Sequence, residues 1–205
     1  MPTGIYQRIV TGYHGCDAAV AARVLAGAAR LNISTNAYDW LGQGIYFWEH
    51  GPQRAREWAI EQAKLSGAKI KEPSVLGARI NLGECLDLLD TANTGVLGEW
   101  YNQFRHTARQ KRSRMPQNRD APGSRRGDKV LRFLDRAVID FTVSHVAEAE
   151  RIIYQTVRGV FLEGEAAFPG SKIARKSHIQ ITVRDPACIL EFFRLDPRLT
   201  VLEKG

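Results

Sequence analysis

The sequence predicts one α+β domain, because segments with the alternating pattern of strands are interspersed with segments of helical periodicity. A chain of 205 residues is of ordinary size for a single domain and is long enough to bury a core. Strands are expected near both ends, over 7–13 and 177–185, with a pair over 75–89. Helices are expected over 17–29, 52–66, about 92–113 and 130–149.

The first strand ends in two residues suited to binding a ligand. Residues Gln7 to Tyr13 are rich in β-branched and aromatic side chains and lead into a small-residue turn. His14 follows at the strand end, where its side chain can point into a cleft. Gly15 has no Cβ, so a ligand could approach its backbone N–H and C=O groups closely. Asp17 is a suitable N-cap for the Ala-rich helix that follows.

A second pattern, Gly-Gln-Gly-Ile-Tyr-Phe, runs from Gly42 to Phe47. Its two glycines permit close approach to the start of another strand, and Tyr46 offers a flat ring and a hydroxyl. The next helix is expected to begin near Pro52, which suits a first helical position. In their order and spacing, the two patterns predict two halves of a nucleotide pocket. One face of the helix that begins near Pro52 would carry Ala55, Trp58, Ala59 and Gln62.

Positive charge is concentrated in one segment of the chain. The whole sequence has 29 Lys and Arg against 22 Asp and Glu, a net charge of +7. Residues 105–132 contain ten basic and two acidic residues, a net charge of +8, so the remainder carries −1. Such a local basic cluster is typical of a surface for an anionic partner. The centre of the segment is rich in turn formers and predicts a flexible loop.

Other features of the composition narrow the class of protein. No apolar run is long enough to span a membrane, and no N-terminal signal is apparent, so a cytoplasmic protein without membrane partners is expected. Cys16, Cys85 and Cys188 are odd in number and widely spaced, which favours reduced core thiols and predicts no metal site.

The two glycine-containing patterns resemble the ADP-ribosyltransferase superfamily, on the side of the poly(ADP-ribose) polymerases and diphtheria-like toxins, which is known for a His-Tyr-Glu signature. The family's strand ending in His-Gly is matched by His14 and Gly15. Its Gly-x-Gly-Ile-Tyr-Phe pattern, followed by a helix with alanine and an aromatic residue, is matched by residues 42–47 and 55–58. The strand pair over 75–89 is also similar, and the resemblance spans about residues 8–90 and 155–195.

The family's catalytic glutamate has a different counterpart in this chain. In the family, a Glu-x-x-x-x-Asp pattern lies on a strand near the C-terminus. Here Gln180 stands five residues before Asp185, so the signature reads His14, Tyr46, Gln180. An amide can hold a ribose hydroxyl, but unlike a carboxylate it cannot deprotonate an acceptor. Glu163 is the first candidate for a compensating carboxylate, and Glu49 is the second.

The resemblance implies a fold and a set of roles. It implies two small antiparallel sheets that face each other across an NAD cleft, with flanking helices. One catalytic domain would cover residues 1–205, with a basic helix–loop insertion at about 91–150. His14 would hold the nicotinamide ribose, Tyr46 would stack on nicotinamide, and Gly15 would bind the carboxamide through its backbone. Other residues expected to line the NAD site are Asn36, Tyr38, Gly44, Phe47 and Trp58.

His178 alternates with Gln180 along the predicted strand and therefore faces the same side. It is a candidate for a second cleft residue, and a structural histidine is an equally good interpretation.

The expected activity is transfer of ADP-ribose from NAD to a macromolecule, as in an intracellular toxin or antiphage effector that a neutralising antitoxin could bind. The basic segment slightly favours a nucleic acid acceptor, RNA before DNA, over a protein. Two alternative functions stay open. The first is an RNA 2′-phosphotransferase, which the presence of Tyr46 disfavours. The second is a catalytically silent NAD- or ADP-ribose-binding module, which Gln180 favours. The residues expected to contact nucleic acid are Arg112, Arg114, Arg125 and Arg126.

Overall fold

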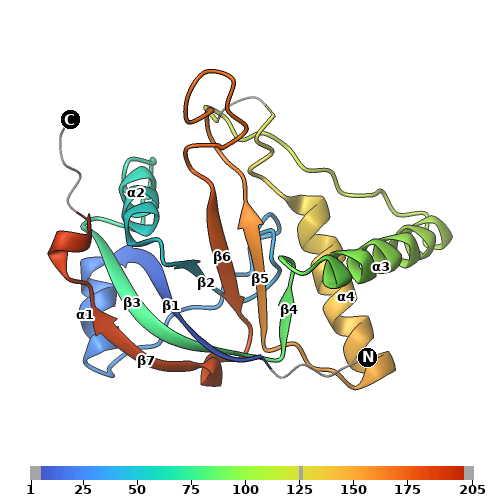
Figure 1. Ribbon diagram of the computed structural model, residues 1–205, viewed down its shortest axis with the longest axis horizontal. Coiled ribbons are helices and arrows are strands. Elements are labelled where there is room, and N and C mark those ends of the chain that lie inside the picture. Colours follow the sequence, from blue (N-terminus) through green and yellow to red (C-terminus); the bar gives the residue numbers. More distant parts are fainter. Residues whose placement is uncertain (1–5, 125–126, 201–205) are drawn as a thin grey trace.

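The structure is a computed structural model that describes residues 6–124 and 127–200 (Figure 1). Seven strands form one mixed, mostly antiparallel sheet in the order β4-β5-β6-β2-β1-β3-β7, so the predicted α+β class is confirmed. The strands are β1 Tyr6–Asp17, β2 Ile45–Glu49, β3 Pro73–Gly83, β4 Cys85–Asp87, β5 Thr156–Phe161, β6 His178–Val183 and β7 Ile189–Arg194. The α-helices are α1 Ala18–Leu25, α2 Pro52–Ala63, α3 Thr91–Gln110 and α4 Phe133–Glu150; two short 3₁₀ helices cover Pro186–Cys188 and Pro197–Thr200.

The sheet has two halves with a narrow junction. Strand β1 pairs with β3 almost along its whole length but with β2 through only two residue pairs, Gly12 with Glu49 and Tyr13 with Trp48. Beyond Tyr13 the two strands separate. The prediction of two separate sheets is therefore corrected: the halves β1-β3-β7 and β4-β5-β6-β2 are one sheet, because these pairs still connect them.

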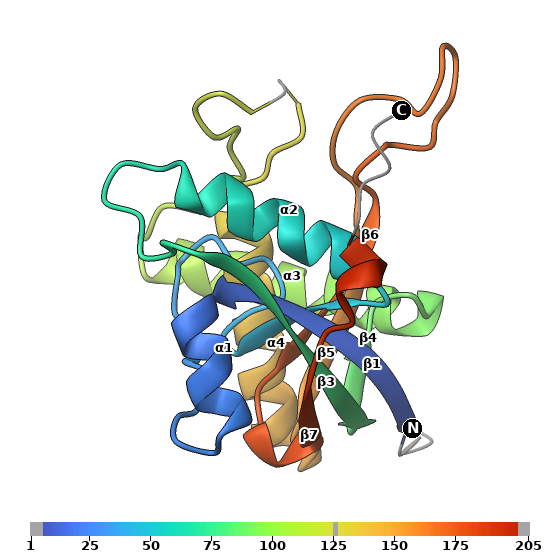
Figure 2. The same ribbon diagram turned by 90° about the vertical axis from the view of Figure 1, so that its left-hand side faces the viewer.

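The two faces of the sheet are covered by different helices. Alternation along β2 puts Ile45 and Phe47 in one core cluster with apolar residues of α1. Tyr46 and Trp48 point to the other face, where α4 and α2 cover them. Figure 2 shows α1 and α2 on either side of β1 and β3. The candidate residues of β1 and β2 are thus distributed over both faces of the sheet.

The predicted helices are confirmed, with shorter ends in most cases. The N-cap of α1 is Asp17, whose carboxylate accepts a hydrogen bond from Ala19 N at 2.9 Å, and α2 begins at Pro52 as expected. Within α2, Ala55 and Ala59 are fully buried. Helices α3 and α4 pack on each other through aromatic rings such as Phe104 and Phe141, 5.3 Å apart.

Helix α3 extends away from the sheet, and residues 111–124 and 127–132 lie between its end and α4 (Figure 1). Among the described residues, no helix is long and apolar enough to cross a membrane.

Candidate functional site

His14 lies where the two halves of the sheet diverge. Its ring Nδ1 is 2.8 Å from the backbone oxygen of Tyr46, just past the last β1–β2 residue pair. Because a carbonyl only accepts, Nδ1 must carry the hydrogen, and in the neutral ring Nε2 is then an acceptor. Burial lowers the pKa of His14 and so favours this neutral form. The ring could therefore accept a hydrogen bond from a hydroxyl group through Nε2.

Gly15 is required by close packing against α2. A Cβ at this position would lie 2.4 Å from the backbone oxygen of Ala55 and 3.0 Å from the Trp58 ring. The nearest aromatic neighbour of Trp58 is Trp48, with ring centroids 5.5 Å apart, and no ring contact with Tyr46 is found among the described residues. The structure thus brings Trp58 close to Gly15, as the pocket hypothesis requires, but not face to face with Tyr46.

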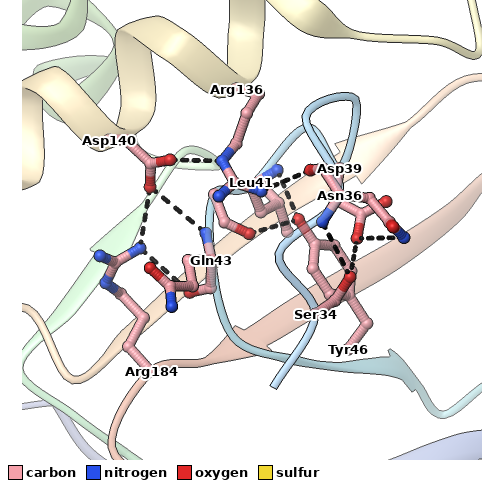
Figure 3. A network of polar contacts seen from close by, with 10 residues as sticks. Ser34, Asn36, Asp39, Leu41, Gln43, Tyr46, Arg136, Asp140 and Arg184 are labelled. Carbon is pink, nitrogen blue, oxygen red and sulfur yellow. Dashed lines mark hydrogen bonds and ion pairs between the residues drawn. The ribbon is translucent and has the colours of Figure 1, made fainter. Parts of the chain in front are cut away.

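Tyr46 uses its hydroxyl to hold the preceding loop. The hydroxyl donates to the Gly42 carbonyl at 2.8 Å and accepts from Leu41 N at 3.0 Å (Figure 3). Burial raises its pKa, so the phenol stays protonated. Gly44 permits the close approach of β2 to β6, since a Cβ would be 2.4 Å from Thr182 Cγ2. The hydroxyl of Tyr46 therefore has a structural role, and the ring is the part that could meet a ligand.

The loop before β2 is fastened to α4 by charged side chains (Figure 3). Arg136 binds Asp140 and donates to the Asn36 carbonyl at 2.6 Å. Arg184 donates to the Gln43 carbonyl at 3.1 Å and to Asp140 at 3.3 Å. This network holds Asn36, in the loop before β2, against α4.

Two further residues expected at the NAD site lie apart from its centre. Tyr38 is 40% exposed and its ring packs edge-on against Phe133 at 6.0 Å. Phe47 is fully buried in the core, and the centroid of its ring lies 5.7 Å from that of the His14 ring.

Gln180 belongs to an aromatic cluster on the α2/α4 face of the sheet. Its Oε1 accepts a hydrogen bond from Trp40 Nε1 at 2.6 Å. The Trp40 ring contacts Phe161 at 5.4 Å, and Phe161 stacks on His178 at 5.5 Å. The His178 ring in turn lies 6.2 Å from Trp48. His178 and Gln180 therefore face the same side of β6, as predicted, and both contact this cluster.

Several buried polar atoms around the aromatic cluster have no hydrogen-bond partner. They are Nε1 of Trp48, Nε and Nη1 of Arg54, Nε of Arg132 and Nε2 of His178. Of these, Nη1 of Arg54 has an ion pair with Glu61 at 3.7 Å. Trp48 is 4% exposed and Arg54 9%. Nδ1 of His178 donates to the Lys176 carbonyl at 2.6 Å, which leaves Nε2 as an acceptor in the neutral ring. Since buried polar groups are nearly always paired, these donors and this acceptor indicate a place for a ligand or ordered water.

Glu163 lies beside these unpartnered atoms. Its carboxylate accepts from Arg54 Nη2 at 3.1 Å, and Lys176 Nζ is 4.0 Å away. The pKa of His178 is lowered mainly by burial and further by the positive charge of Arg54, while Glu163 acts in the opposite direction. Glu163 also lines a cavity of about 330 Å³, whose other walls include Ser124 and Asp128 and the 163–176 hairpin. The first candidate carboxylate is thus next to the aromatic cluster and open to a cavity.

Glu49, the second candidate carboxylate, is on the other face of the sheet. It forms two hydrogen bonds with Arg158, at 2.5 and 3.0 Å, and Arg158 also binds Asp87 at 2.9 Å. All three residues are buried. The geometry makes Glu49 part of a closed ion-pair network, away from Gln180.

The basic segment divides into two parts. Arg119 packs against Phe133, Lys129 binds Asp120 at 3.2 Å and Arg132 lies 4.7 Å over the Phe161 ring. By contrast, a cationic tip at the end of α3 is exposed and has no acidic partner among the described residues. Arg125 and Arg126 lie outside the described residues. The tip consists of Arg105, Arg109, Lys111, Arg112 and Arg114.

Sequence reasoning missed the residues that complete the aromatic cluster. Trp40, Arg54 and Phe161 carry no motif of their own, and only the pairing of β5, β6 and β2 brings them together. One signal was available for Trp48: it alternates with Tyr46 and so had to share its face.

No protein-family model, curated protein or solved structure matches this chain. The functional interpretation therefore depends on the residues themselves.

Proposed function

We propose that this protein transfers ADP-ribose from NAD to a macromolecular acceptor, at the junction between the two halves of its sheet. The observation that carries the proposal is the set of unpartnered buried polar atoms on Trp48, Arg54 and His178, beside Glu163 and Gln180. Aromatic walls and a few convergent polar groups are typical of a site for a flat polar ring. Nicotinamide, with its aromatic ring and carboxamide, has this chemistry.

The proposed reaction needs stabilisation of a positively charged ribose. The bond from ribose C1′ to the nicotinamide nitrogen breaks, the acceptor attacks C1′, and the acceptor proton goes to a base. The Gln180 amide oxygen is a dipole that can face the developing charge. Glu163 supplies the carboxylate that Gln180 lacks, and its cavity gives the acceptor access. The His14 ring contacts Phe47 on the α1 side, and its Nε2 would accept from a ribose hydroxyl where the two halves of the sheet diverge.

The acceptor class follows from charge. The cationic tip carries five basic residues, and no acidic residue occurs between Glu99 and Asp120 in the sequence. Lysine and arginine contacts to phosphates release counterions and are strongly favoured at low salt. We therefore propose a nucleic acid acceptor, RNA before DNA, docked at this tip.

The test of the transfer activity is incubation of the protein with labelled NAD and cell extract. We expect nicotinamide release and label in macromolecules, with both lost in His14→Ala and Tyr46→Ala variants that remain folded. Full activity in either variant would exclude this site. Separate protease and nuclease treatment of the labelled product identifies the acceptor class.

The test of the docking surface compares two sets of neutralised cations. Replacing Arg105, Arg109, Arg112 and Arg114 by Gln should abolish salt-sensitive RNA retention and macromolecular transfer, with unchanged affinity for NAD. The matched control replaces Arg119 and Lys129, which have partners within the fold. If wild-type RNA binding is absent at low salt, a protein acceptor becomes the better interpretation.

One observation favours a second function, a catalytically silent NAD- or ADP-ribose-binding module. Gln180 Oε1 is already engaged by Trp40, and Glu163 is neutralised by Arg54. Saturable NAD binding, by calorimetry, without nicotinamide release in any extract would support this alternative over transfer.

A further inference from the structure

Another cavity of the described residues lies away from the proposed transfer site. It has a volume of about 580 Å³, which is within the usual range for small-ligand pockets. Its walls come from the loop before β2, from α4, from the α4–β5 connection and from the end of β6. None of its lining residues belongs to the aromatic cluster, so a ligand here would be additional to NAD.

One wall of this cavity is apolar and partly open to solvent. Ile153 is 72% exposed and Ile33 is 41% exposed, while Val143 of α4 is buried. Large aliphatic side chains at a concave rim are a common feature of ligand sites. This wall would cover the apolar body of a ligand.

The polar part of the cavity lining is held rigidly. The Gln155 carbonyl accepts from the backbone N–H groups of Arg184 and Asp185, at 2.9 and 3.1 Å. Its side chain donates to Asp185 at 3.1 Å and accepts from Glu84 N at 3.2 Å. Because these bonds exist without a ligand, binding would cost little reordering of this part of the lining.

Arg184 presents an unused edge at this polar part of the lining. Only its Nη1 is engaged, by the Gln43 carbonyl and Asp140. Nε and Nη2 have no acceptor among the described residues, and together they form the fork that binds carboxylate or phosphate in a bidentate manner. The Gln43 side-chain amide, also at the cavity, is exposed and has no partner in the described part of the chain. These groups form the end of the site that would bind the anionic group of a ligand.

We propose that this cavity binds a small amphipathic anion, with one carboxylate or phosphate on Arg184 and an apolar body against Ile33, Val143 and Ile153. The site is coupled to the loop before β2 through two neighbouring carbonyl groups. Arg184 Nη1 donates to the Gln43 carbonyl, and the Tyr46 hydroxyl donates to the Gly42 carbonyl (Figure 3). A bound anion would therefore fix the segment that supports Tyr46. The proposal does not depend on the transfer activity.

The test is an NMR titration of the ¹⁵N-labelled full chain with phenyl phosphate, and with benzoate as the carboxylate probe. We expect saturable shifts at Gln43, Ile153 and Arg184, followed by smaller shifts at Leu41 and Gly42. The Arg184→Gln variant should weaken binding at least 10-fold. Since that change also removes the contacts to Gln43 and Asp140, a second variant is needed.

The second variant is Ile153→Glu, which changes a 72% exposed side chain outside the loop network and places a negative charge at the rim. We expect it to abolish the shifts while the spectrum stays that of a folded protein. Arg23→Gln, at an exposed position of α1, is the matched control and should bind like the wild type. Wild-type binding in both test variants, or no saturable shift with either probe, would overturn the proposal.

Discussion

Two arginine–carboxylate groups, one on each face of the sheet, differ in how completely their hydrogen bonds are satisfied. On the α1 face, Arg158 lies between Glu49 and Asp87 with both carboxylates bound through several N–H groups. On the other face, Arg54 binds Glu163 through Nη2, its Nη1 has only a 3.7 Å ion pair with Glu61, and its Nε is buried without a hydrogen-bond partner. Both glutamates were candidates for the missing catalytic carboxylate.

The difference separates a structural network from a site. A buried charge network with every donor satisfied holds a fold in one arrangement, and loss of one member leaves uncompensated charge. A group with unsatisfied donors keeps the capacity to bind something else. We infer that Glu49 serves folding and that Glu163 serves the proposed reaction.

The largest expected effect is on the satisfied network. The Arg158→Met variant leaves Glu49 and Asp87 buried without their cation, so we expect the free energy of unfolding to fall by about 3–5 kcal/mol. Urea denaturation measures it. The control is Arg79→Met, which removes a pair with Glu191 that is about half exposed on both sides, and should cost about 0–1 kcal/mol. Equal losses in the two variants would contradict the distinction between the two groups.

The second expected effect is on the unsatisfied group. The Glu163→Gln variant keeps the shape of the side chain but cannot take a proton from an acceptor, so we expect transfer to fall about 100-fold. The unfolding free energy should also fall, by about 1–3 kcal/mol, because Arg54 is buried and its ion pair with Glu163 becomes a hydrogen bond to a neutral amide. Glu165→Gln, two residues away and exposed, is the control for the hairpin. Unchanged transfer in Glu163→Gln would remove Glu163 from the mechanism.

Much of the fold and part of the site were predictable from sequence. Period-two and helical patterns predicted β1, β2, α1 and α2, because these elements are amphipathic and carry clear caps, such as Asp17 and Pro52. The joining of the two halves of the sheet was not predictable, since two residue pairs leave no signal in the sequence.

The partners of the site residues could not be predicted either. Arg54 and Glu163 are 109 residues apart in sequence, and Trp40 and Gln180 are 140 apart. Contacts of such separation depend on strand order, which local patterns do not specify. The division of the basic segment has the same origin, because Arg132 gains its place on Phe161 only through the packing of β5 beside α4.

The third prediction concerns the amide beside the unsatisfied group. The Gln180→Ala variant removes one hydrogen bond between neutral groups and a dipole, so transfer should fall about 10-fold. Gln180→Glu should retain transfer with a changed ratio of transfer to NAD hydrolysis, since a carboxylate can accept from Trp40 and also act as a base. The measurement is the ratio of labelled acceptor to free ADP-ribose. Wild-type rates in Gln180→Ala would show that this position does not contact the reacting groups.

The smallest expected effect is a pH dependence of stability from the histidines near the site. Burial is the main cause that lowers the pKa of His14 and of His178 below the ordinary value of 6.5, so the unfolded chain binds protons at a higher pH than the folded chain does. Stability from these rings is therefore complete above pH 6.5 and is lost as the pH falls through that value toward the folded pKa. The loss is at most about 1.4 kcal/mol per histidine at one pH unit below 6.5.

Urea denaturation at pH 7.5 and 5.5 should show a smaller loss in His178→Gln than in the wild type, while the exposed control His106→Gln should follow the wild type. An equal loss in His178→Gln would mean that His178 is charged in the folded protein and that its Nε2 is not an acceptor beside Arg54.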